Sequence, residues 1–392
     1  MKYPYTMKVL EQCRISPPSG SVPQISLPLT IFDIRMLCVP PVTRFFYYKI
    51  HRSETEFMDT VLPSIKSSLA LTLQQFFPLA GNLIWSPQSS KPEILYMDGD
   101  SISFTVAESD LDFIHVSGNH PRNANMLYPL IPQLPPTCDA MVPLLALQVT
   151  LFPNSGICIG TTVSHVVADG KTSSHFMKSW ASVCRLSKDT PFMTPSSLPF
   201  YDRMTMKDTN EATFVLGQPE IDRIKRWVLI RIIEKNMKLE KPSFNLSTTH
   251  LNPALPENYF GNCNVRCSAA ANKEDLLGED GIVIASEIIG KGIQNIRSTE
   301  GILEAIQNEV ANFWTLPEHF FLTAGSPKFG VYVTDFGWGR PKKVEVAAID
   351  FTKAICLCEL SDGEVGLEFG LTLSKVEMDT FASHFADTLK AL

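Results

Sequence analysis

The chain has 392 residues, a net charge of −7 at pH 7, 44% hydrophobic residues and 19% charged residues. This balance is typical of a folded globular protein, and the negative charge without a long basic stretch argues against general nucleic-acid binding. Because one hydrophobic core rarely serves so many residues, we expect two domains. No apolar run reaches the length of a membrane span, and residues 1–23 lack a leader pattern. We therefore expect a cytoplasmic protein with no membrane partner.

The nine cysteines are scattered along the chain. Two pairs are closely spaced, Cys263 with Cys267 and Cys356 with Cys358, but neither has the other ligands that a zinc site needs. The sequence therefore predicts free thiols in a reducing compartment and no bound metal.

The first half of the chain alternates between helical and strand patterns. Residues 62–77 place apolar side chains on one face at helical spacing, with proline in the first turn, which predicts a helix. Residues 94–96 and 102–106 alternate as strands do. Residues 144–152 and 157–163 are two β-rich runs around Pro153-Asn154-Ser155-Gly156, which predicts a hairpin. Residues 171–183 then return to helical spacing.

His165 lies on the loop between this hairpin and this helix, in the run Ser164-His165-Val166-Val167-Ala168-Asp169-Gly170. An imidazole is a candidate general base because its ordinary pKa lies near neutral pH. Asp169 is placed to orient the loop through buried hydrogen bonds or an ion pair. Taken alone, a His-x-x-x-Asp match is more often a chance occurrence. None of the other seven histidines is followed four residues later by aspartate.

Periodicity disappears between residues 186 and 211, where serine and proline are frequent. We expect an extended linker there, between a domain of residues 1–185 and a domain of residues 212–392. The second domain is predicted to hold strands and helices in the following order: a strand at 212–216, helices at 219–229, 282–296 and 302–314, strands at 329–334, 343–351, 355–360 and 365–373, and a closing helix at 375–392.

A second motif, Asp335-Phe336-Gly337-Trp338-Gly339, lies in this half. A protein kinase is excluded because neither a glycine-rich phosphate loop nor a His-Arg-Asp loop precedes it. Gly337 and Gly339 allow a tight turn while Trp338 and Phe336 fill a core or an interface. We expect Asp335 to anchor the turn by an ion pair or by backbone hydrogen bonds, and we favour this structural role over a catalytic one.

The two motifs, in this order, resemble those of the plant BAHD acyltransferases. Further segments resemble family blocks, and Tyr259-Phe260-Gly261-Asn262-Cys263 is similar to the block of the clade that acylates anthocyanin, flavonoid and other phenolic glucosides. The resemblance covers nearly the whole chain. The other segments that carry it are 29–33, 43–48, 77–83, 324–327 and 337–345.

The resemblance implies an α/β fold of two domains like chloramphenicol acetyltransferase, each a mixed sheet flanked by helices, with a tunnel between them. It implies an acyl-CoA co-substrate, malonyl-CoA favoured, a phenolic glycoside as acceptor, and no bound cofactor or metal. His165 would be the general base, while Asp169 and Asp335 would hold geometry through arginine partners. Block position suggests acyl-CoA contacts at Arg44, Asn262 and Ser326, although we favour structural packing as the role of each. Gly170 would be a structural member of the first motif. A monomer is expected.

The chain departs from the family at residues 248–251. In relatives, the segments that correspond to 244–247 and 252–256 are separated by a further helix and strand, which end in a short segment with an arginine. Here only residues 248–251 join the two segments. The second domain is therefore expected to lack that helix and strand. Two alternatives stay open. The same fold can use acetyl-CoA or an aromatic acyl-CoA, or the chain is an inactive relative that binds ligand without turnover.

Overall fold

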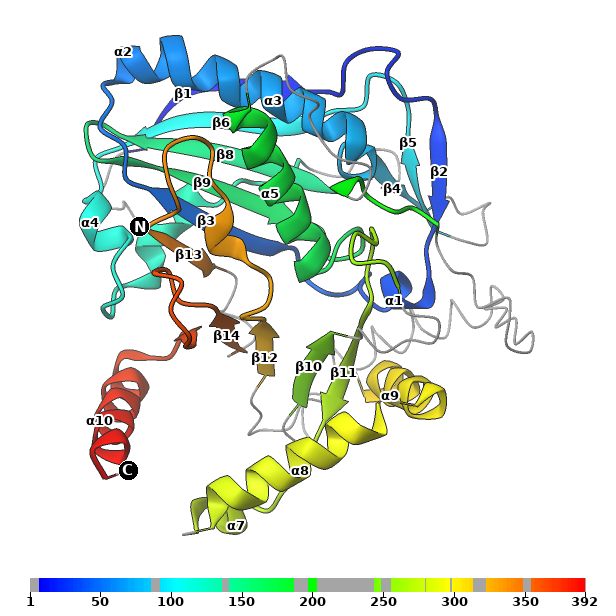
Figure 1. The fold of residues 1–392 in the computed structure, drawn as a ribbon, viewed down its shortest axis with the longest axis vertical. Helices are drawn as coiled ribbons and strands as arrows, with labels where there is room; N and C mark the ends of the chain where they lie inside the picture. The colour runs from blue at the N-terminus through cyan, green and yellow to red at the C-terminus, as the bar shows by residue number, and fades with distance from the viewer. Residues whose placement is uncertain are drawn as a thin grey trace, which may run out of the picture.

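In the computed structural model of this protein, the described residues are 7–85, 92–135, 141–186, 197–202, 243–247, 255–278, 280–296, 298–312, 322–347 and 354–391. The predicted strand at 212–216, the helix at 219–229, the short connector at 248–251 and most of the linker lie outside these ranges. The described elements form an α/β fold in which mixed sheets are flanked by helices (Figure 1). This confirms the fold class.

A six-stranded sheet forms the larger half of the molecule, with the strand order β1-β6-β8-β9-β3-β13. Only β6 and β8 are parallel to each other, and the other neighbours are antiparallel. Its strands are β1 (Met7–Ile15), β3 (Val42–Tyr48), β6 (Ile102–Ser109), β8 (Leu145–Phe152), β9 (Gly156–Val163) and β13 (Lys343–Val346).

The strands β8 and β9 are the predicted hairpin, and every residue in both is buried. Helices cover both faces of this sheet, so neither strand has a solvent-exposed face. The polar residues of the hairpin are buried with the apolar ones, namely Gln148, Thr150, Thr161 and Thr162. Asn154 takes the left-handed conformation in the connecting turn (φ 57°), which asparagine tolerates better than most residues.

Two long helices, α3 (Leu62–Gln75) and α5 (Gly170–Arg185), lie against each other on one face of the sheet (Figure 1). They confirm the helices predicted at 62–77 and 171–183. The indole of Trp180 on α5 donates to the Ile65 carbonyl of α3 at 3.2 Å, which ties the two helices together. The opposite face is covered by α4 (Phe113–Val116) and the 3₁₀ segment η3 (Ala124–Leu130).

A four-stranded sheet of order β2-β5-β4-β7 lies beside the larger one. Residues 29–33, which carry part of the resemblance and match an N-terminal strand of the family, do not form a strand here, because the Thr30–Asp33 capping box starts the short helix α1. The remaining elements of this half are β2 (Ile25–Pro28), α1 (Ile31–Ile34), α2 (Glu54–Glu56), the π-helical turn η1 (Phe57–Val61), η2 (Phe77–Leu79), β4 (Asn82–Ile84), β5 (Glu93–Tyr96) and β7 (Met141–Pro143).

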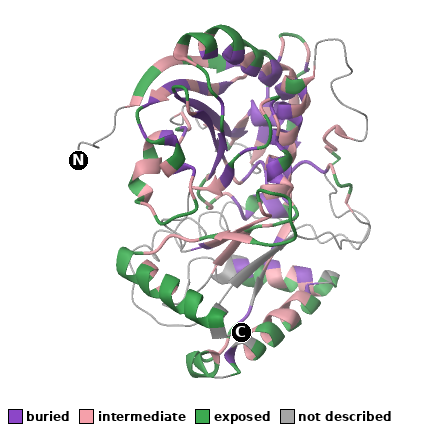
Figure 2. Ribbon diagram, turned by 60° about the vertical axis from the view of Figure 1, so that its left-hand side comes forward, coloured by how far each residue is buried: buried purple, intermediate pink, exposed green. Residues whose placement is uncertain are grey.

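A five-stranded sheet of order β11-β10-β12-β14-β15 forms the smaller half. It comprises β10 (Ser243–Ser247), β11 (Asn264–Ser268), β12 (Leu322–Gly325), β14 (Ala354–Cys358) and β15 (Glu368–Gly370). Its helices are α7 (Lys273–Leu277), α8 (Gly281–Asn295), α9 (Thr299–Asn312) and α10 (Lys375–Ala391). In Figure 2 the helices α7 and α10 are mostly exposed and α8 and α9 are partly buried, whereas β3, β8 and β9 of the larger sheet are buried.

The helices predicted at 282–296, 302–314 and 375–392 are confirmed as α8, α9 and α10. The strand at 355–360 is confirmed as β14, and that at 365–373 shrinks to the three residues of β15. The strand predicted at 329–334 is wrong. Gly330 takes the left-handed conformation (φ 62°) and starts a 3₁₀ turn, η5 (Val331–Val333), in place of extended chain.

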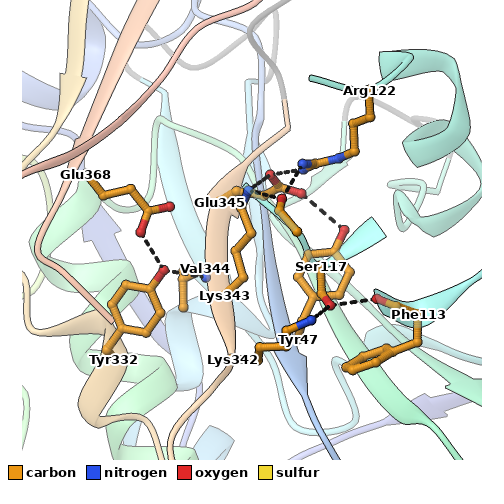
Figure 3. Close-up of polar contacts among 11 residues, drawn as sticks. Tyr47, Phe113, Ser117, Arg122, Tyr332, Lys342, Lys343, Val344, Glu345 and Glu368 are labelled. Atoms are coloured by element: carbon orange, nitrogen blue, oxygen red, sulfur yellow. Dashed lines mark hydrogen bonds and ion pairs between the residues drawn. The ribbon is translucent and has the colours of Figure 1, made fainter. Parts of the chain in front are cut away.

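The strand β13 belongs to the larger sheet although in the chain it lies between β12 and β14 of the smaller one. It pairs with β3 from Lys343 opposite Tyr47 to Val346 opposite Arg44. Polar contacts also hold β13 against the first half of the chain. Arg122 forms an ion pair with Glu345, and the Lys343 ammonium donates to the Gly118 carbonyl at 2.7 Å (Figure 3). The second half of the chain therefore contributes one strand to the larger sheet.

Candidate active site

His165 lies two residues beyond the end of β9, where the chain turns toward α5. Two backbone hydrogen bonds hold the turn, from Ser164 N to Leu144 O at 2.8 Å and from Val167 N to Ser164 O at 3.2 Å. Val166, Val167 and Ala168 are buried in the main core, while His165 keeps partial solvent access. The apolar residues of the motif thus anchor the loop, and the imidazole is left at the contact with the 255–264 segment.

Asn262 contacts both the imidazole and the backbone of this loop. Its amide nitrogen donates to the carbonyls of His165 (2.9 Å) and Val166 (3.2 Å) and to the Asp33 carboxylate (2.9 Å). Its amide oxygen lies 3.2 Å from His165 Nδ1. The opposite amide orientation would set an oxygen against three acceptors, so the orientation is fixed by chemistry. His165 Nδ1 is therefore the protonated nitrogen in neutral imidazole, and Nε2 carries the lone pair.

The pKa of His165 is lowered, because burial penalises the charged imidazolium. The Asp169 charge and the Asn262 hydrogen bond act in the opposite direction, and the Arg35 charge adds to the lowering. Neutral imidazole is consequently the dominant form at neutral pH, which is the form a general base requires.

Asp169 is the N-cap of α5, and its two carboxylate oxygens bind two different segments. Oδ1 accepts the backbone N–H of Thr172 at 2.8 Å, and Oδ2 accepts that of Cys263 at 3.2 Å. The Thr172 hydroxyl in turn donates to the Gly261 carbonyl at 2.9 Å. The start of α5 is thus joined to the 259–263 block on which Asn262 lies. Among the described residues these partners are backbone amides, not the arginine that the family pattern implies.

Arg44 lies on the face of β3 that points toward α5 and is 6% exposed. Its guanidinium donates to the Ser174 hydroxyl at 2.9 Å. Burial lowers its pKa, and the groups that oppose this are Cys358, Cys356 and Glu359. Burial also raises the pKa of Cys356 to about 11 and that of Cys358 to about 12, so both thiols are neutral at pH 7. Arg44 forms no ion pair with a carboxylate in the described ranges.

The second motif lies at the other end of α5. Asp335 Oδ1 accepts the N–H groups of Gly337 (2.8 Å) and Gly339 (2.9 Å), both at positive φ, and Oδ2 lies 3.7 Å from Arg185 in the last turn of α5. The rings of Phe336 and Trp338 stack at 5.3 Å, and Phe336 meets Trp180 edge-on at 4.9 Å. Sixteen helical residues span about 24 Å, so this motif is remote from His165.

The other predicted residues have local roles in the structure. Ser326 follows β12, and its hydroxyl accepts the Lys328 N–H at 3.2 Å within a turn. Gly170 lies where a Cβ would approach the Phe329 ring to 2.6 Å, which favours glycine there. Sequence reasoning missed Asp33 entirely. The spacing of a capping box with Thr30 is visible in the sequence, but nothing there links Asp33 to Asn262.

Comparison with known proteins identifies the family. Residues 6–241 and 248–388 match the model of the Transferase family, the BAHD acyltransferases. The chain belongs to this family. Like its BAHD relatives it is an enzyme that transfers acyl groups. Among the described residues, no helix is long and apolar enough to cross a membrane, and no three His, Cys, Asp or Glu side chains gather as a metal site.

Several curated relatives are about one-third identical to this BAHD chain over nearly its whole length. The malonyl-coenzyme A:anthocyanin 3-O-glucoside-6''-O-malonyltransferase of Dahlia pinnata is 34% identical, covering 98% of each chain. The phenolic glucoside malonyltransferase 1 of Nicotiana tabacum is 34% identical over 98% of this chain and 99% of its own. A coumaroyl-CoA:anthocyanidin 3-O-glucoside-6''-O-coumaroyltransferase of Arabidopsis thaliana is also 34% identical, over 98% and 97%.

Solved structures show the same fold at lower identity. Vinorine synthase matches with a TM-score of 0.70 at 18% identity, covering 95% of this chain and 96% of its own. F. graminearum TRI101 complexed with coenzyme A and T-2 mycotoxin matches with a TM-score of 0.62 at 13% identity, over 92% and 97%. The alignment to the Dahlia enzyme runs over 451 positions, which is more than the 392 residues of this chain. The sequence of this chain therefore has gaps in that alignment.

Proposed function

We propose that this protein transfers an acyl group, malonyl in the first instance, from coenzyme A to a hydroxyl of a phenolic glucoside. The observation that carries the proposal is the His165–Asn262 contact, which leaves Nε2 as the free base at the meeting of the two sheets. The named activities of the Dahlia and tobacco relatives support the substrate classes. Acyl-CoA is a co-substrate, and no bound cofactor takes part.

His165 Nε2 takes the proton of the sugar hydroxyl as that oxygen attacks the thioester carbonyl. Such general-base assistance contributes about 10²–10⁴ in rate. The tetrahedral intermediate then expels the coenzyme A thiolate, and the imidazolium returns the proton to its sulfur. Asp169 and Asp335 hold geometry in this scheme, since both carboxylates are occupied by backbone amides.

Arg44 supports the choice of a dicarboxylic acyl group. A buried guanidinium flanked by a hydroxyl and by neutral thiols is stabilised by an incoming carboxylate. We propose that Arg44 binds the free carboxylate of malonyl-CoA, with Ser326 as a further donor-side residue. Asn262 is fully buried and both ends of its amide bind protein groups, so we assign it to the support of His165 and not to the donor. A charged hydrogen bond of about 1.5–3 kcal/mol corresponds to a loss of roughly 10- to 100-fold in kcat/KM for malonyl-CoA in Arg44→Leu, with acetyl-CoA little affected.

The deciding assay incubates purified protein with malonyl-CoA, acetyl-CoA and coumaroyl-CoA in turn, each with a panel of phenolic glucosides, and detects products by mass spectrometry. We expect malonylated product that His165→Ala abolishes. The matched control is His384→Ala, which removes an exposed histidine on α10 and should leave the rate unchanged. Folded protein that yields no acylated product with any donor would refute the proposal in favour of an inactive relative. A rate unaffected by His165→Ala would refute the role of the base.

A coumaroyl donor is the second candidate, because the Arabidopsis relative with this named donor is as similar as the malonyltransferases. Coumaroyl has no carboxylate for Arg44. A preference for coumaroyl-CoA that Arg44→Leu leaves intact would decide for this candidate.

A further inference from the structure

Asp33 is a buried carboxylate, 0% exposed, at the point where α1 meets the 259–263 block. The capping box of α1 determines the orientation of the Asp33 carboxylate. Its Oδ2 accepts the backbone N–H of Thr30 at 2.9 Å and the Thr30 hydroxyl at 2.7 Å. Oδ1 is thereby directed at Asn262, whose backbone N–H and side-chain amide both donate to it, at 3.1 and 2.9 Å.

A single carboxylate oxygen therefore holds Asn262 at two points. The same amide presents its oxygen to His165 Nδ1 at 3.2 Å. The three side chains form one continuous line of hydrogen bonds from α1 to the imidazole, although Asp33 and Asn262 are 229 residues apart. The neighbouring Arg35 forms a separate buried ion pair with Glu309, which fixes the end of α1 against α9.

We propose that Asp33 is a positioning residue for acyl transfer, which acts through Asn262 to hold the His165 ring with Nδ1 protonated and Nε2 aimed at the acceptor hydroxyl. This inference rests on the proposed role of His165 as the base. When Nε2 takes the hydroxyl proton, the C–O bond forms and the imidazolium keeps Nδ1–H on the Asn262 oxygen. When the C–S bond breaks, the Nε2 proton passes to the thiolate, so the Asp33–Asn262 contacts are unchanged throughout.

The physical basis is charge-assisted hydrogen bonding between buried groups. Charged acceptors bind N–H donors about twice as strongly as neutral ones, and a chain of such bonds polarises its members. In a variant without the Asp33 carboxylate, the backbone N–H and the side-chain amide of Asn262 both lose this acceptor. We expect the side-chain amide then to move away from His165. A misplacement of about 1 Å at a reacting group can reduce the rate roughly 100-fold. Substrate contacts are not altered, so kcat falls while KM for the acyl-CoA changes little.

A double-mutant cycle on the full-length protein tests the chain of contacts. Asp33→Ala and Asn262→Ala should each lower kcat about 10- to 100-fold. Because Asp33 acts through Asn262, adding Asp33→Ala to Asn262→Ala should lower kcat no further. Asp33→Asn keeps one acceptor oxygen for Asn262, and we expect it to recover part of the kcat lost in Asp33→Ala.

The matched control is Thr30→Val, which removes the side-chain half of the capping box but leaves the oxygen that faces Asn262. We expect a lower melting temperature with kcat near that of the wild type. Equal loss of kcat in Thr30→Val and Asp33→Ala, or additive losses in the cycle, would overturn the inference, because either result would show only weakened folding of α1.

A measurement without turnover separates this inference from the proposed function. In protein labelled with ¹⁵N-histidine, the His165 resonances are assigned by their absence in His165→Ala. We expect a protonated Nδ1 in the wild type and in Thr30→Val, and a mixture of tautomers in Asp33→Ala. This pattern in a wild-type protein without activity would refute the proposed function and support the positioning. An Nε2-protonated imidazole in the wild type would refute the positioning, whatever the activity.

Discussion

Asp169 provides a sharp test of how the first motif is held together, since its carboxylate binds the start of α5 and the Cys263 N–H at once. Loss of a helix N-cap costs about 1 kcal/mol, and loss of a charged acceptor by a buried N–H costs about 1.5–3 kcal/mol. Asp169→Ala, which removes both, should lower the free energy of unfolding by about 2–4 kcal/mol. Asp169→Asn keeps one acceptor oxygen but sets an NH₂ group against the other N–H. We expect it to cost about 1–3 kcal/mol.

The free energies come from urea unfolding followed by tryptophan fluorescence, with Trp180 as the buried reporter. The matched control is Asp112→Ala, since Asp112 is an exposed N-cap whose carboxylate accepts the Ile114 N–H at 2.8 Å. It should cost about 1 kcal/mol and leave kcat unchanged. The Asp169 variants should also lose kcat, because Cys263 adjoins Asn262. Equal costs for Asp169→Ala and Asp112→Ala would refute the link between α5 and the 259–263 block.

Burial determines the outcome of three further perturbations. Phe336→Ala should lower the free energy of unfolding by about 3–5 kcal/mol, measured in urea, because the ring is 2% exposed among three aromatic neighbours. Arg35→Met should cost about 3–5 kcal/mol by removing the nearer partner of the buried Glu309 carboxylate, which keeps the longer pair with Arg266 at 3.7 Å, and adding Glu309→Met should recover part of that cost. The kcat/KM of acyl transfer should fall with decreasing pH, with its midpoint below 6.5, because burial lowers the pKa of His165 and protonation removes the base. A midpoint above 6.5 would contradict this assignment.

Elements determined by short-range patterns could be predicted from the sequence. The hairpin of β8 and β9 follows from two apolar runs around Pro153-Asn154-Ser155-Gly156, and α3 from five apolar residues on one face. The strand expected at 329–334 failed because the left-handed Gly330 interrupts a segment whose side chains otherwise suit a strand. Propensity is a weak guide where one backbone angle decides.

The contacts around His165 could not be predicted, since they join segments far apart in the sequence. His165 and Asn262 are 97 residues apart, and Arg35 and Glu309 are 274 apart. Position within a family block suggested a donor-side contact for Asn262, and its bond to the imidazole emerged only from the packing of the 259–263 block on the loop after β9. Asp33 gave no signal because its capping box already accounts for an aspartate at that position.

The helix α5 explains why the two motifs occur together. Asp169 caps its first turn, Arg185 in its last turn pairs with Asp335, and Trp180 between them packs against Phe336. The exposed Arg185–Asp335 pair adds little stability by itself, so the aromatic packing is what fixes this end of the helix. A shift of α5 would displace Asp169 and Thr172 together, and with them the 259–263 block that carries Asn262. The two motifs are therefore joined by one helix about 24 Å long, with Asp169 at its first turn and the Asp335 turn at its last.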